Sequence, residues 1–421
     1  MTIDQGVNAM PAKKLLQAVL TLCVCALLAC CAGCTASPAA SSAQPSGSSA
    51  AEATASAALS AATSSAADAA PVLADCPVSR SSNSDGVFIE IPVADFNALG
   101  FAFGDSVDVT FSNGYALKGI PYYNGTLVEP GDALLLGSSK LPSIEVGVFY
   151  GDDLWVTAGL SEGDTATVTL AEAGGFADIQ KALDIAYTDE RADYPNDVAF
   201  ANFRELSGGN LKPGKFYRGA SPVNNKHNRA AYANALIADA GVQVDFDLAD
   251  NDDEIESFLE EDAKAGIDVS YFEGLRNASN VIAIDLHAAY QTEGYGRKVA
   301  AGLVELMQHD GPVYIHCTAG KDRTGFVCML LEALAGASYQ QIVDDYLFTY
   351  DNYYQINAAN NAESFRIIKE QRLDRMLRHV LGAGKDTDLA SADLPAGARN
   401  YLKTVGMTDE QIDQLTAYLC A

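Results

Sequence analysis

The stretch "VYIHCTAGKDRTGF", from Val313 to Phe326, decides the fold of the second half of this chain. It begins with a short run of β-branched and aromatic residues and continues into a small polar loop. The apolar run "GFVCMLLEALAG" follows directly. This order predicts a buried strand, a tight loop and a buried helix. Cys317 opens the loop and Arg323 closes it, with Gly320 between them.

The residue types in this loop suit the binding of a phosphate. Gly320 permits backbone conformations that turn N–H groups inward, and the start of the helix supplies more of them. Arg323 can hold two phosphate oxygens with its planar fork. The same positive surroundings should lower the pKa of the Cys317 thiol, and a thiolate can attack phosphorus. Thr324 is placed to donate a hydroxyl to the leaving thiolate. His316 is expected to fix the loop, and Cys328 to be a core residue.

The segments around the loop predict an α/β domain over residues 176–421. "VQVDFDL", "NVIAIDL" and "PVYIHC" are short apolar strands, and a helical pattern with Val299, Leu303 and Met307 separates the last two. Strand–helix–strand order with short links implies a largely parallel sheet flanked by helices. Near the end of the chain, "PAGARNYLKTVGMTDEQIDQLTAYL" predicts a helical hairpin with Thr408 as an N-cap.

Residues 77–175 predict a separate all-β domain. Short alternating runs such as "SVDVTFSNG", "SIEVGVFY" and "TATVTLAE" are divided by Gly-Asp turns, a pattern typical of a small barrel or sandwich. The domain is either a ligand-binding module or an accessory part that acts as a spacer or shapes the substrate site.

The first residues predict export. Lys13 and Lys14 precede the apolar run "LLQAVLTLCVCALLAC", which suits a signal peptide better than a membrane span. The following "LLACCAGC" resembles a bacterial lipobox, so residues 1–33 are expected to be removed and Cys34 lipidated, with Cys30 as the alternative. Residues 34–76 are rich in Ala and Ser and should form a flexible tether. The expected location is the outer face of the cytoplasmic membrane; a secreted protein is the alternative.

Composition excludes some partners. The chain has 27 basic and 55 acidic residues and a formal net charge of -28. Such a field repels nucleic acids and anionic lipid headgroups. The few cysteines beyond the signal region make no disulfide framework, although a single Cys76–Cys420 bridge and two free thiols are both open.

The sequence "HCTAGKDRTG" resembles the protein tyrosine phosphatase superfamily, in the atypical bacterial branch with the loop HCxxGKDRTG. "NFRELSGGNLKPGKFYRGASP" and "VDFDLAD" are similar to two further motifs of this branch, and the likeness spans about residues 190–420. It implies hydrolysis of phosphate monoesters without a metal or other cofactor. Cys317 is then the nucleophile and Arg323 the phosphate-binding arginine, with Thr318, Ala319, Gly320 and Lys321 lining the loop. The chain departs from the family at Ala249, where an arginine is usual.

The general acid has two candidates. Asp322 lies within the loop, and in this branch the equivalent aspartate is held to be the acid. Asp285 lies 32 positions before Cys317 (317 minus 285), as in many members of the superfamily. Asp322 is favoured, while Asp247 is a third candidate that would support the loop. Lys321 either contacts phosphate, as similar lysines do in members that act on phosphoinositides, or faces solvent.

The sequence therefore predicts a phosphatase with a cysteinyl-phosphate intermediate and broad, dual specificity for phosphoproteins. Inositol phosphates or phosphoinositides, small phosphate esters, and an inert surface binding protein are the alternatives.

Overall fold

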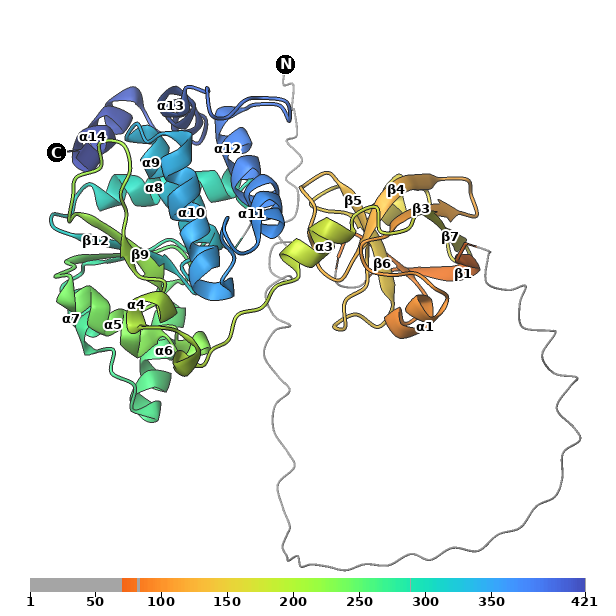
Figure 1. Ribbon diagram of the computed structural model, residues 1–421, viewed down its shortest axis with the longest axis horizontal. Helices are drawn as coiled ribbons and strands as arrows, with labels where there is room; N and C mark the ends of the chain where they lie inside the picture. The colour runs from red at the N-terminus through yellow and green to blue at the C-terminus, as the bar shows by residue number, and fades with distance from the viewer. Residues whose placement is uncertain (1–69, 82–83, 288, 421) are drawn as a thin grey trace, which may run out of the picture.

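The computed structural model describes residues 70–81, 84–287 and 289–420. The predicted signal peptide, most of the tether and the lipidation site at Cys34 lie outside the described residues. Two folded parts follow one another along the chain, an N-terminal barrel and a C-terminal α/β domain (Figure 1). Among the residues described, no helix is long and apolar enough to cross a membrane.

The first part is a closed barrel with the strand order β1-β2-β6-β5-β4-β3-β7. Its strands are β1 (Val72–Arg80), β2 (Val87–Ile89), β3 (Ser106–Phe111), β4 (Ala116–Tyr123), β5 (Ala133–Leu136), β6 (Ile144–Val148) and β7 (Thr165–Glu172), with the short helices α1 (Val93–Ala98) and α2 (Leu154–Thr157) between them. In β3, the buried Val107, Val109 and Phe111 alternate with the half-buried Asp108 and Thr110, which is the period of a strand with one face in a core. The expectation of a barrel-like β domain is confirmed.

The barrel begins earlier than residue 77. Val72 and Leu73 of β1 pair with Thr169 and Val168 of β7, so these residues close the barrel. They directly follow an Ala-rich run, which is why composition alone placed them in the tether. Cys76 and Cys420 are both free thiols, so the possible bridge between them is absent from the described residues.

The second part is built on a five-stranded sheet of order β11-β10-β12-β9-β8. Its strands are β8 (Arg204–Glu205), β9 (Phe216–Ala220), β10 (Val244–Asp247), β11 (Val281–Ala283) and β12 (Val313–Cys317). β10 pairs in parallel with β11 and β12, and β12 pairs in parallel with β9. Only the short edge strand β8 runs antiparallel to its neighbour. The carboxyl ends of the parallel strands therefore meet at one edge of the sheet.

Helices cover both faces of this sheet (Figure 1). On one side lie α5 (Ala230–Asp239), α6 (Asp252–Ala265) and α7 (Ser270–Asn277), and on the other lie α8 (Glu293–Leu306), α9 (Asp322–Leu334), α10 (Tyr339–Tyr354), α12 (Asp374–Leu381), α13 (Leu394–Thr404) and α14 (Asp409–Cys420). The short α4 (Asp197–Phe200), α11 (Ala362–Ile368) and the π-helical turn η3 (Lys369–Leu373) complete this part, along with the 3-10 turns η1 (Arg191–Asp193) and η2 (Asn225–His227).

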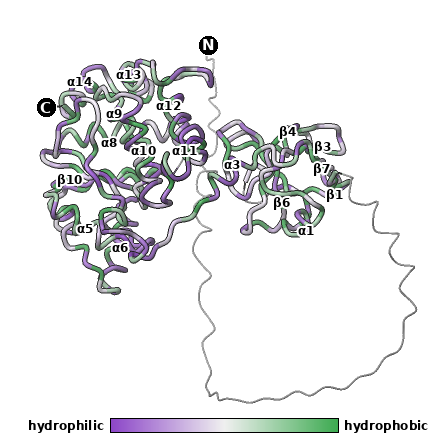
Figure 2. Tube along the Cα trace, viewed as in Figure 1, coloured by the Kyte–Doolittle hydropathy of each residue, from purple (hydrophilic) through white to green (hydrophobic). Residues whose placement is uncertain are grey.

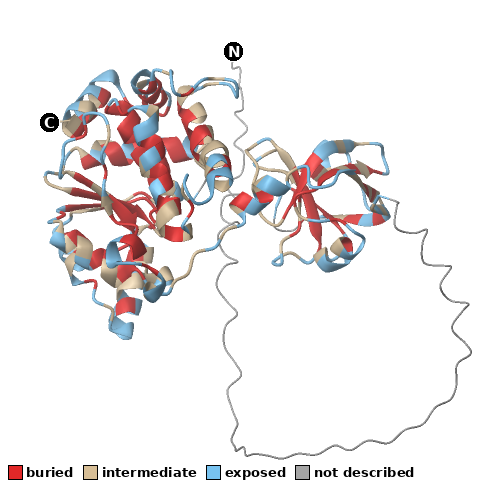
Figure 3. Cartoon of the chain, viewed as in Figure 1, coloured by how far each residue is buried: buried red, intermediate tan, exposed pale blue. Residues whose placement is uncertain are grey.

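The hydrophobic residues explain this layering. β12 is buried along its whole length, and α9 is buried from Thr324 to Leu334. Buried segments fill the centre of each part in Figure 3, and the outer helix α6 is largely hydrophilic in Figure 2. The predicted buried helix after the cysteine loop is thus confirmed, and it supports the loop from within the core.

Helix α3 (Ala177–Leu183) connects the two parts and packs against α11 (Figure 1). Leu183 and Ile185, at its end, pack against the core of the α/β domain. The segment that connects the barrel to the α/β domain is therefore held by half-buried apolar contacts.

Candidate active site

The cysteine loop lies where sequence predicted it, at the carboxyl end of the central strand. β12 ends at Cys317, α9 begins at Asp322, and Thr318–Lys321 form the turn between them. The Cys317 side chain is 3% exposed. The predicted strand–loop–helix arrangement is confirmed.

The loop carbonyl groups are tied outward to the surrounding scaffold. Each of three successive carbonyl oxygens accepts hydrogen bonds from a different element. The donors are Ser221 N for Thr318 O at 3.2 Å, Tyr353 OH for Ala319 O at 2.8 Å, and both Arg218 Nη2 and Asn202 Nδ2 for Gly320 O at 3.1 Å each.

Because a trans peptide unit is planar, its N–H points opposite to its C=O. The outward carbonyls therefore turn the amides of Ala319, Gly320 and Lys321 toward the inside of the loop. Within the part of the chain that the structure describes, no protein acceptor takes a hydrogen bond from these amides. Successive inward N–H groups make an anion-binding concavity, and the N-terminus of α9 adds its positive end.

Gly320 is required by this geometry. Its φ is +64°, and a Cβ at this position would lie 2.1 Å from the carbonyl oxygen of Gly219. Any side chain here would push the loop away from β9 and disturb the carbonyl contacts that orient the amides.

Arg323 is held at both ends of its guanidinium group. Nη2 donates to Thr318 Oγ1 at 3.1 Å, and Nη1 donates to Leu286 O at 3.2 Å. A guanidinium fixed in this way is ready for an anion without further loss of side-chain entropy.

The loop changes the acidity of its cysteine. Burial alone would raise the pKa of the Cys317 thiol, but the Arg323 charge and the hydroxyl and amide of Thr324 outweigh it and lower the pKa. Thr324 is fully buried beside the thiol, as its predicted role requires. In contrast, burial raises the pKa of Cys328 to about 12, so this thiol stays protonated in the core.

His316 supports the loop from below. Its Nε2 lies 2.8 Å from Asp245 Oδ1, and both side chains are fully buried. Burial would lower the pKa of His316, but Asp245 and Asp247 raise it to about 10, while burial also raises the pKa of its partner Asp245. His316 is thus a buried, structural hydrogen-bonding residue, as the sequence predicted.

Asp285 lies close to the loop but is poorly suited to donate a proton. Its carboxylate pairs with Lys298 at 2.8 Å and lies near His287. Burial would raise the pKa of Asp285, yet Lys298 and His287 outweigh this and lower it. Its group with Glu254 and His287 has ligand-type atoms within 4.8 Å of one another, and Lys298 already neutralises part of that charge.

Asp322 and Lys321 stand at the rim. The Asp322 side chain is 67% exposed and lies 3.7 Å from Lys321 Nζ. Lys321 Nζ also donates to Tyr354 OH at 3.1 Å and lies over the Tyr350 and Tyr354 rings. Lys321 is therefore drawn to the tyrosines of α10 rather than free in solvent.

Asp250 is a carboxyl group that the sequence reasoning missed. It is 5% exposed and follows β10, whose carboxyl end neighbours that of β12. Burial and the nearby Asp247 and Glu254 raise the pKa of Asp250 to about 7, and Arg323 acts on the same carboxyl. The signal in the sequence was its position in "VDFDLAD", just after a predicted strand that neighbours the strand of Cys317. The raised pKa of Asp250, however, depends mainly on its burial.

Asp247 holds the turn that carries Asp250. Its Oδ1 accepts from the amides of Ala249 at 2.8 Å and Asp250 at 3.2 Å. The sequence suggested that Asp247 supports the cysteine loop; in the structure its carboxylate supports the turn after β10 instead. Ala249, which replaces the arginine usual in the family, is buried in this turn.

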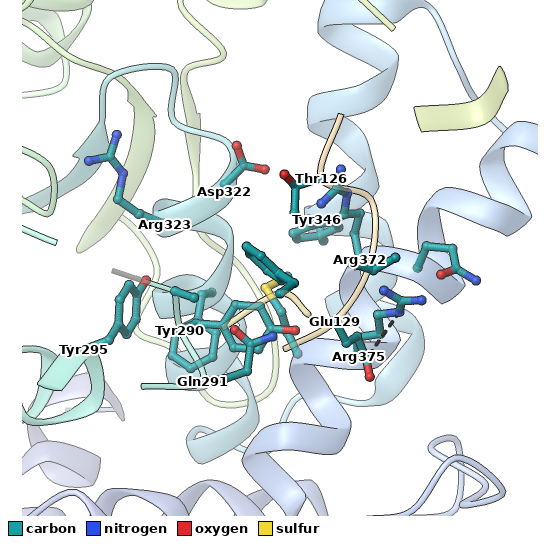
Figure 4. Close-up of a pocket in the computed structure, with 16 residues that line it drawn as sticks. Thr126, Glu129, Tyr290, Gln291, Tyr295, Asp322, Arg323, Tyr346, Arg372 and Arg375 are labelled. Carbon is teal, nitrogen blue, oxygen red and sulfur yellow. Dashed lines mark ion pairs between the residues drawn. The ribbon is translucent and has the colours of Figure 1, made fainter. Parts of the chain in front are cut away.

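A pocket of about 260 Å³ adjoins the loop at Asp322 and Arg323 (Figure 4). Its α/β-domain side includes the rings of Tyr290, Tyr295 and Tyr346. The Asp322 carboxylate turns toward this pocket in Figure 4. The other wall comes from the barrel, which sequence could not anticipate.

Comparisons with known proteins agree with this geometry. A family model described as "Tyrosine phosphatase family" matches residues 198–421, more than half of the chain. A tyrosine-protein phosphatase of Nostoc commune is 30% identical over 127 residues, 27% of this chain and 40% of the relative. The triple specificity protein phosphatase PtpB of Mycobacterium tuberculosis is 30% identical over 182 residues, 41% of this chain and 64% of the relative.

The chain thus spans less than two thirds of the length of these relatives. The core catalytic domain of the PP-IP phosphatase SIW14 of S. cerevisiae aligns with a TM-score of 0.23 at 16% identity, over 42% of this chain and 93% of that one. The family match covers the cysteine loop, both strands beside it and every helix behind it. The chain belongs to the tyrosine phosphatase family.

Proposed function

We propose that this protein hydrolyses phosphate monoesters through a cysteinyl-phosphate intermediate, with phosphotyrosine proteins as its main substrates. The thiolate of Cys317 attacks phosphorus, the P–S bond forms, and the bond to the leaving oxygen breaks. The leaving oxygen takes a proton from a carboxyl group. Water then attacks the intermediate, returns a proton to that carboxylate, and releases phosphate and the thiolate.

One observation carries this proposal: the outward carbonyls of Thr318, Ala319 and Gly320 leave a ring of inward amides beside a thiol of lowered pKa. The inward amides can donate hydrogen bonds to the equatorial oxygens of a phosphate. The fixed guanidinium group of Arg323 adds positive charge where negative charge develops in the transition state. The two relatives described above are named as tyrosine-protein and triple specificity phosphatases, which supports phosphoprotein substrates with broad specificity.

Phosphate release from phosphotyrosine and phosphoserine peptides, phosphoinositides and inositol phosphates tests the proposal. Activity that resists a chelator and vanishes in Cys317→Ser is expected. The matched control is Cys420→Ser, which removes a half-exposed thiol of α14 far from the loop in sequence. A Cys317→Ser enzyme with full activity, or no phosphate release from any of these substrates by the wild type, would contradict the mechanism.

We assign the proton transfer to Asp250 ahead of Asp322 and Asp285, because Asp250 follows β10 beside the carboxyl end of β12 and its carboxyl is acted on by the charge of Arg323. A general acid must hold its proton near neutral pH, and the raised pKa of Asp250, about 7, meets that condition. The lowered pKa of Asp285 does not. Asp322 faces the pocket and is the alternative donor, with Asp250 then tuning Arg323.

We also propose that Cys34 anchors the protein by lipid to the outer face of the membrane, with residues 34 to about 71 as its tether. The lipobox-like "LLACCAGC" supports this proposal. Mass spectrometry of the mature N-terminus should find a diacylated Cys34. A diacylated Cys30 would move the site, and an unmodified N-terminus would indicate secretion.

A further inference from the structure

The barrel supplies one wall of the pocket beside the cysteine loop. Thr126, Val128, Glu129 and Phe149 line it from the barrel side, opposite side chains that extend from α9, η3 and α12. In Figure 4, Thr126 lies with Tyr346 and Arg372, and a dashed line joins Glu129 to Arg375. The barrel therefore contributes to the surface next to the cysteine loop, which a simple spacer need not do.

The barrel wall is anchored where it meets the α/β domain. Asn124 begins the barrel loop that carries Thr126 and Glu129. Its side chain accepts a hydrogen bond from Gln180 of α3 and donates one to Asp184 just after α3, each at 2.7 Å. A second barrel segment, after β6, also contacts the α/β domain: Tyr150 OH accepts a hydrogen bond from the amide of Ala289 at 3.2 Å. With Leu183 and Ile185 packed into the α/β core, these contacts fix the barrel loop against the pocket.

The positive charges in the pocket are unequal. Arg375 Nε pairs with Glu129 Oε1 at 3.0 Å, so the barrel neutralises this arginine. The half-buried side chain of Arg372 lines the same pocket and makes no hydrogen bond or ion pair to any residue that the structure describes, although the charge of Asp322 acts on it. Arg372 lies on the π-helical turn η3, a local widening that often marks functional positions in helices.

The Asp322 carboxylate balances part of the Arg372 charge, but no side chain among the described residues hydrogen-bonds the guanidinium group, so its donors remain open to a ligand anion. Aromatic walls beside it suit an aryl leaving group, and the guanidinium fork suits a carboxylate or phosphate attached to that group. Glu129 works against such an anion, because it both occupies Arg375 and adds negative charge.

We propose that the barrel forms one wall of the leaving-group subsite, and that Arg372 and Glu129 set its selectivity for phosphotyrosine peptides with a second anionic group near the phosphotyrosine. Arg372 attracts that group, and Glu129 limits the attraction to a single arginine. This inference rests on the proposed function and adds to it a substrate class and a role for the barrel.

The experiment compares kcat/KM for two phosphotyrosine peptides that differ only in glutamate or glutamine beside the phosphotyrosine. Arg372→Gln should lower the glutamate-to-glutamine ratio about fivefold, and Glu129→Gln should raise it by a similar factor, the size of one half-buried charge contact. The matched control is Glu162→Gln, which removes the same charge from an exposed barrel position outside the pocket lining. The control should keep the wild-type ratio.

Opposite shifts in the two pocket variants would establish the subsite. Ratios that stay at the wild-type value in both, or shift equally in Glu162→Gln, would overturn it and return the barrel to the role of a spacer. A wild-type enzyme that cleaves p-nitrophenyl phosphate through Cys317 while these ratios do not move refutes this inference alone. A wild-type enzyme without that activity refutes the proposed function instead.

Discussion

Cys317 and Cys328 are both buried, yet their surroundings predict opposite reactivity. Arg323 and Thr324 lower the pKa of Cys317 against the effect of burial, whereas burial raises that of Cys328 to about 12. Iodoacetamide at about pH 6 should therefore label Cys317 and leave Cys328 unmodified, because only the thiolate reacts. Peptide mass spectrometry of the folded protein measures both sites at once.

The Arg323→Met variant provides the control for this labelling. Without the guanidinium, the pKa of Cys317 should rise, so the labelling rate near neutral pH should fall and recover only at higher pH. Equal labelling of Cys317 and Cys328, or a rate in Arg323→Met equal to wild type, would mean that the loop does not activate the thiol.

Asp250 predicts a pH dependence. Its pKa is raised to about 7, so the protonated, proton-donating form is lost as pH rises through that value, and activity should decline with it. Asp250→Asn should lose about 100-fold in kcat on alkyl phosphates and much less on p-nitrophenyl phosphate, whose leaving group needs no proton. The decline near pH 7 should also disappear.

Asp285→Asn is the comparison for this pH profile, because the lowered pKa of Asp285 leaves it no proton to lose near neutrality. If Asp285→Asn or Asp322→Asn, and not Asp250→Asn, shows the leaving-group dependence, the proton donor is that residue instead.

The sequence was sufficient for some of these residues and not for others. Cys317, Arg323 and Thr324 occupy one contiguous motif, so spacing alone identifies them. The pKa of Asp250 is raised by burial and by the charges of Asp247, at the end of β10, and Glu254, in α6. Asp247 and Glu254 are close to Asp250 in the sequence, but burial contributes most to the shift, and burial depends on tertiary packing.

Among the elements, the turn between β12 and α9 depends on Gly320, whose conformation keeps the loop carbonyls outward and the amides inward. Gly320→Ala would place a Cβ 2.1 Å from Gly219 O and strain a φ of +64°. We expect a loss of phosphatase activity of at least about 100-fold, since misplaced oxyanion-type donors cost this much. Phosphate release and thermal unfolding of the variant measure the two effects separately.

Gly266→Ala is the matched control, because Gly266 also has a positive φ, +70°, but nothing lies within 4 Å of its Cβ position. It should lose about 1 kcal/mol of stability and keep its activity. Full activity in Gly320→Ala would show that the orientation of the loop amides is not needed.

Helix α10 is coupled to the loop by a buried charge network. Asp345 accepts from Arg204 Nε at 2.7 Å and pairs with Arg218, which also donates to Gly320 O. Asp345→Asn removes the carboxylate that pairs with two buried guanidinium groups and leaves near them Glu332, a buried carboxyl group of raised pKa, so we expect a loss of about 3–5 kcal/mol in the free energy of unfolding. Urea unfolding measures it.

The same network predicts an acid limit. Burial would raise the pKa of Asp345, but Arg204 and Arg218 outweigh it and lower the pKa. Its stabilisation is therefore present above the ordinary carboxyl pKa and is lost as pH falls through the lowered folded value. Asp345→Asn should remove this part of the acid dependence; an unfolding free energy equal to wild type at neutral pH would contradict the network.

Local signals predicted elements well where caps and periodicity coincide. Thr408 Oγ1 accepts from Gln411 N at 3.2 Å at the start of α14, as the cap predicted from "MTDEQ" requires. In contrast, the first residues of β1 follow an Ala-rich run, and only their pairing with β7 reveals them as barrel residues.

At the scale of the whole molecule, net charge predicts a salt dependence. A formal charge of -28 repels anionic phosphopeptides over distances longer than the pocket itself. Raising ionic strength from low values should therefore increase kcat/KM for acidic phosphopeptides, because salt screens this repulsion. A fall in kcat/KM with salt would show instead that attraction by the basic pocket dominates association.

The docking of barrel and α/β domain could not be predicted from the sequence. The loop from Thr126 to Glu129 and the helical turn with Arg372 and Arg375 are distant in the chain and carry no shared motif. Both folds were accessible from alternation and helical periodicity because these patterns are local. The pocket that the two parts line together depends on α3 and on side chains that come together only in the folded protein.

In the proposed mechanism the phosphoryl group passes through Cys317, and trapping the cysteinyl-phosphate observes this step itself. Wild-type enzyme is mixed with p-nitrophenyl phosphate, quenched rapidly under denaturing conditions and digested, and the peptides are read by mass spectrometry. We predict a phosphate on the Cys317 peptide that is absent from Cys317→Ser. Steady turnover with an unmodified Cys317, together with activity retained in Cys317→Ser, would rule out a cysteinyl-phosphate intermediate.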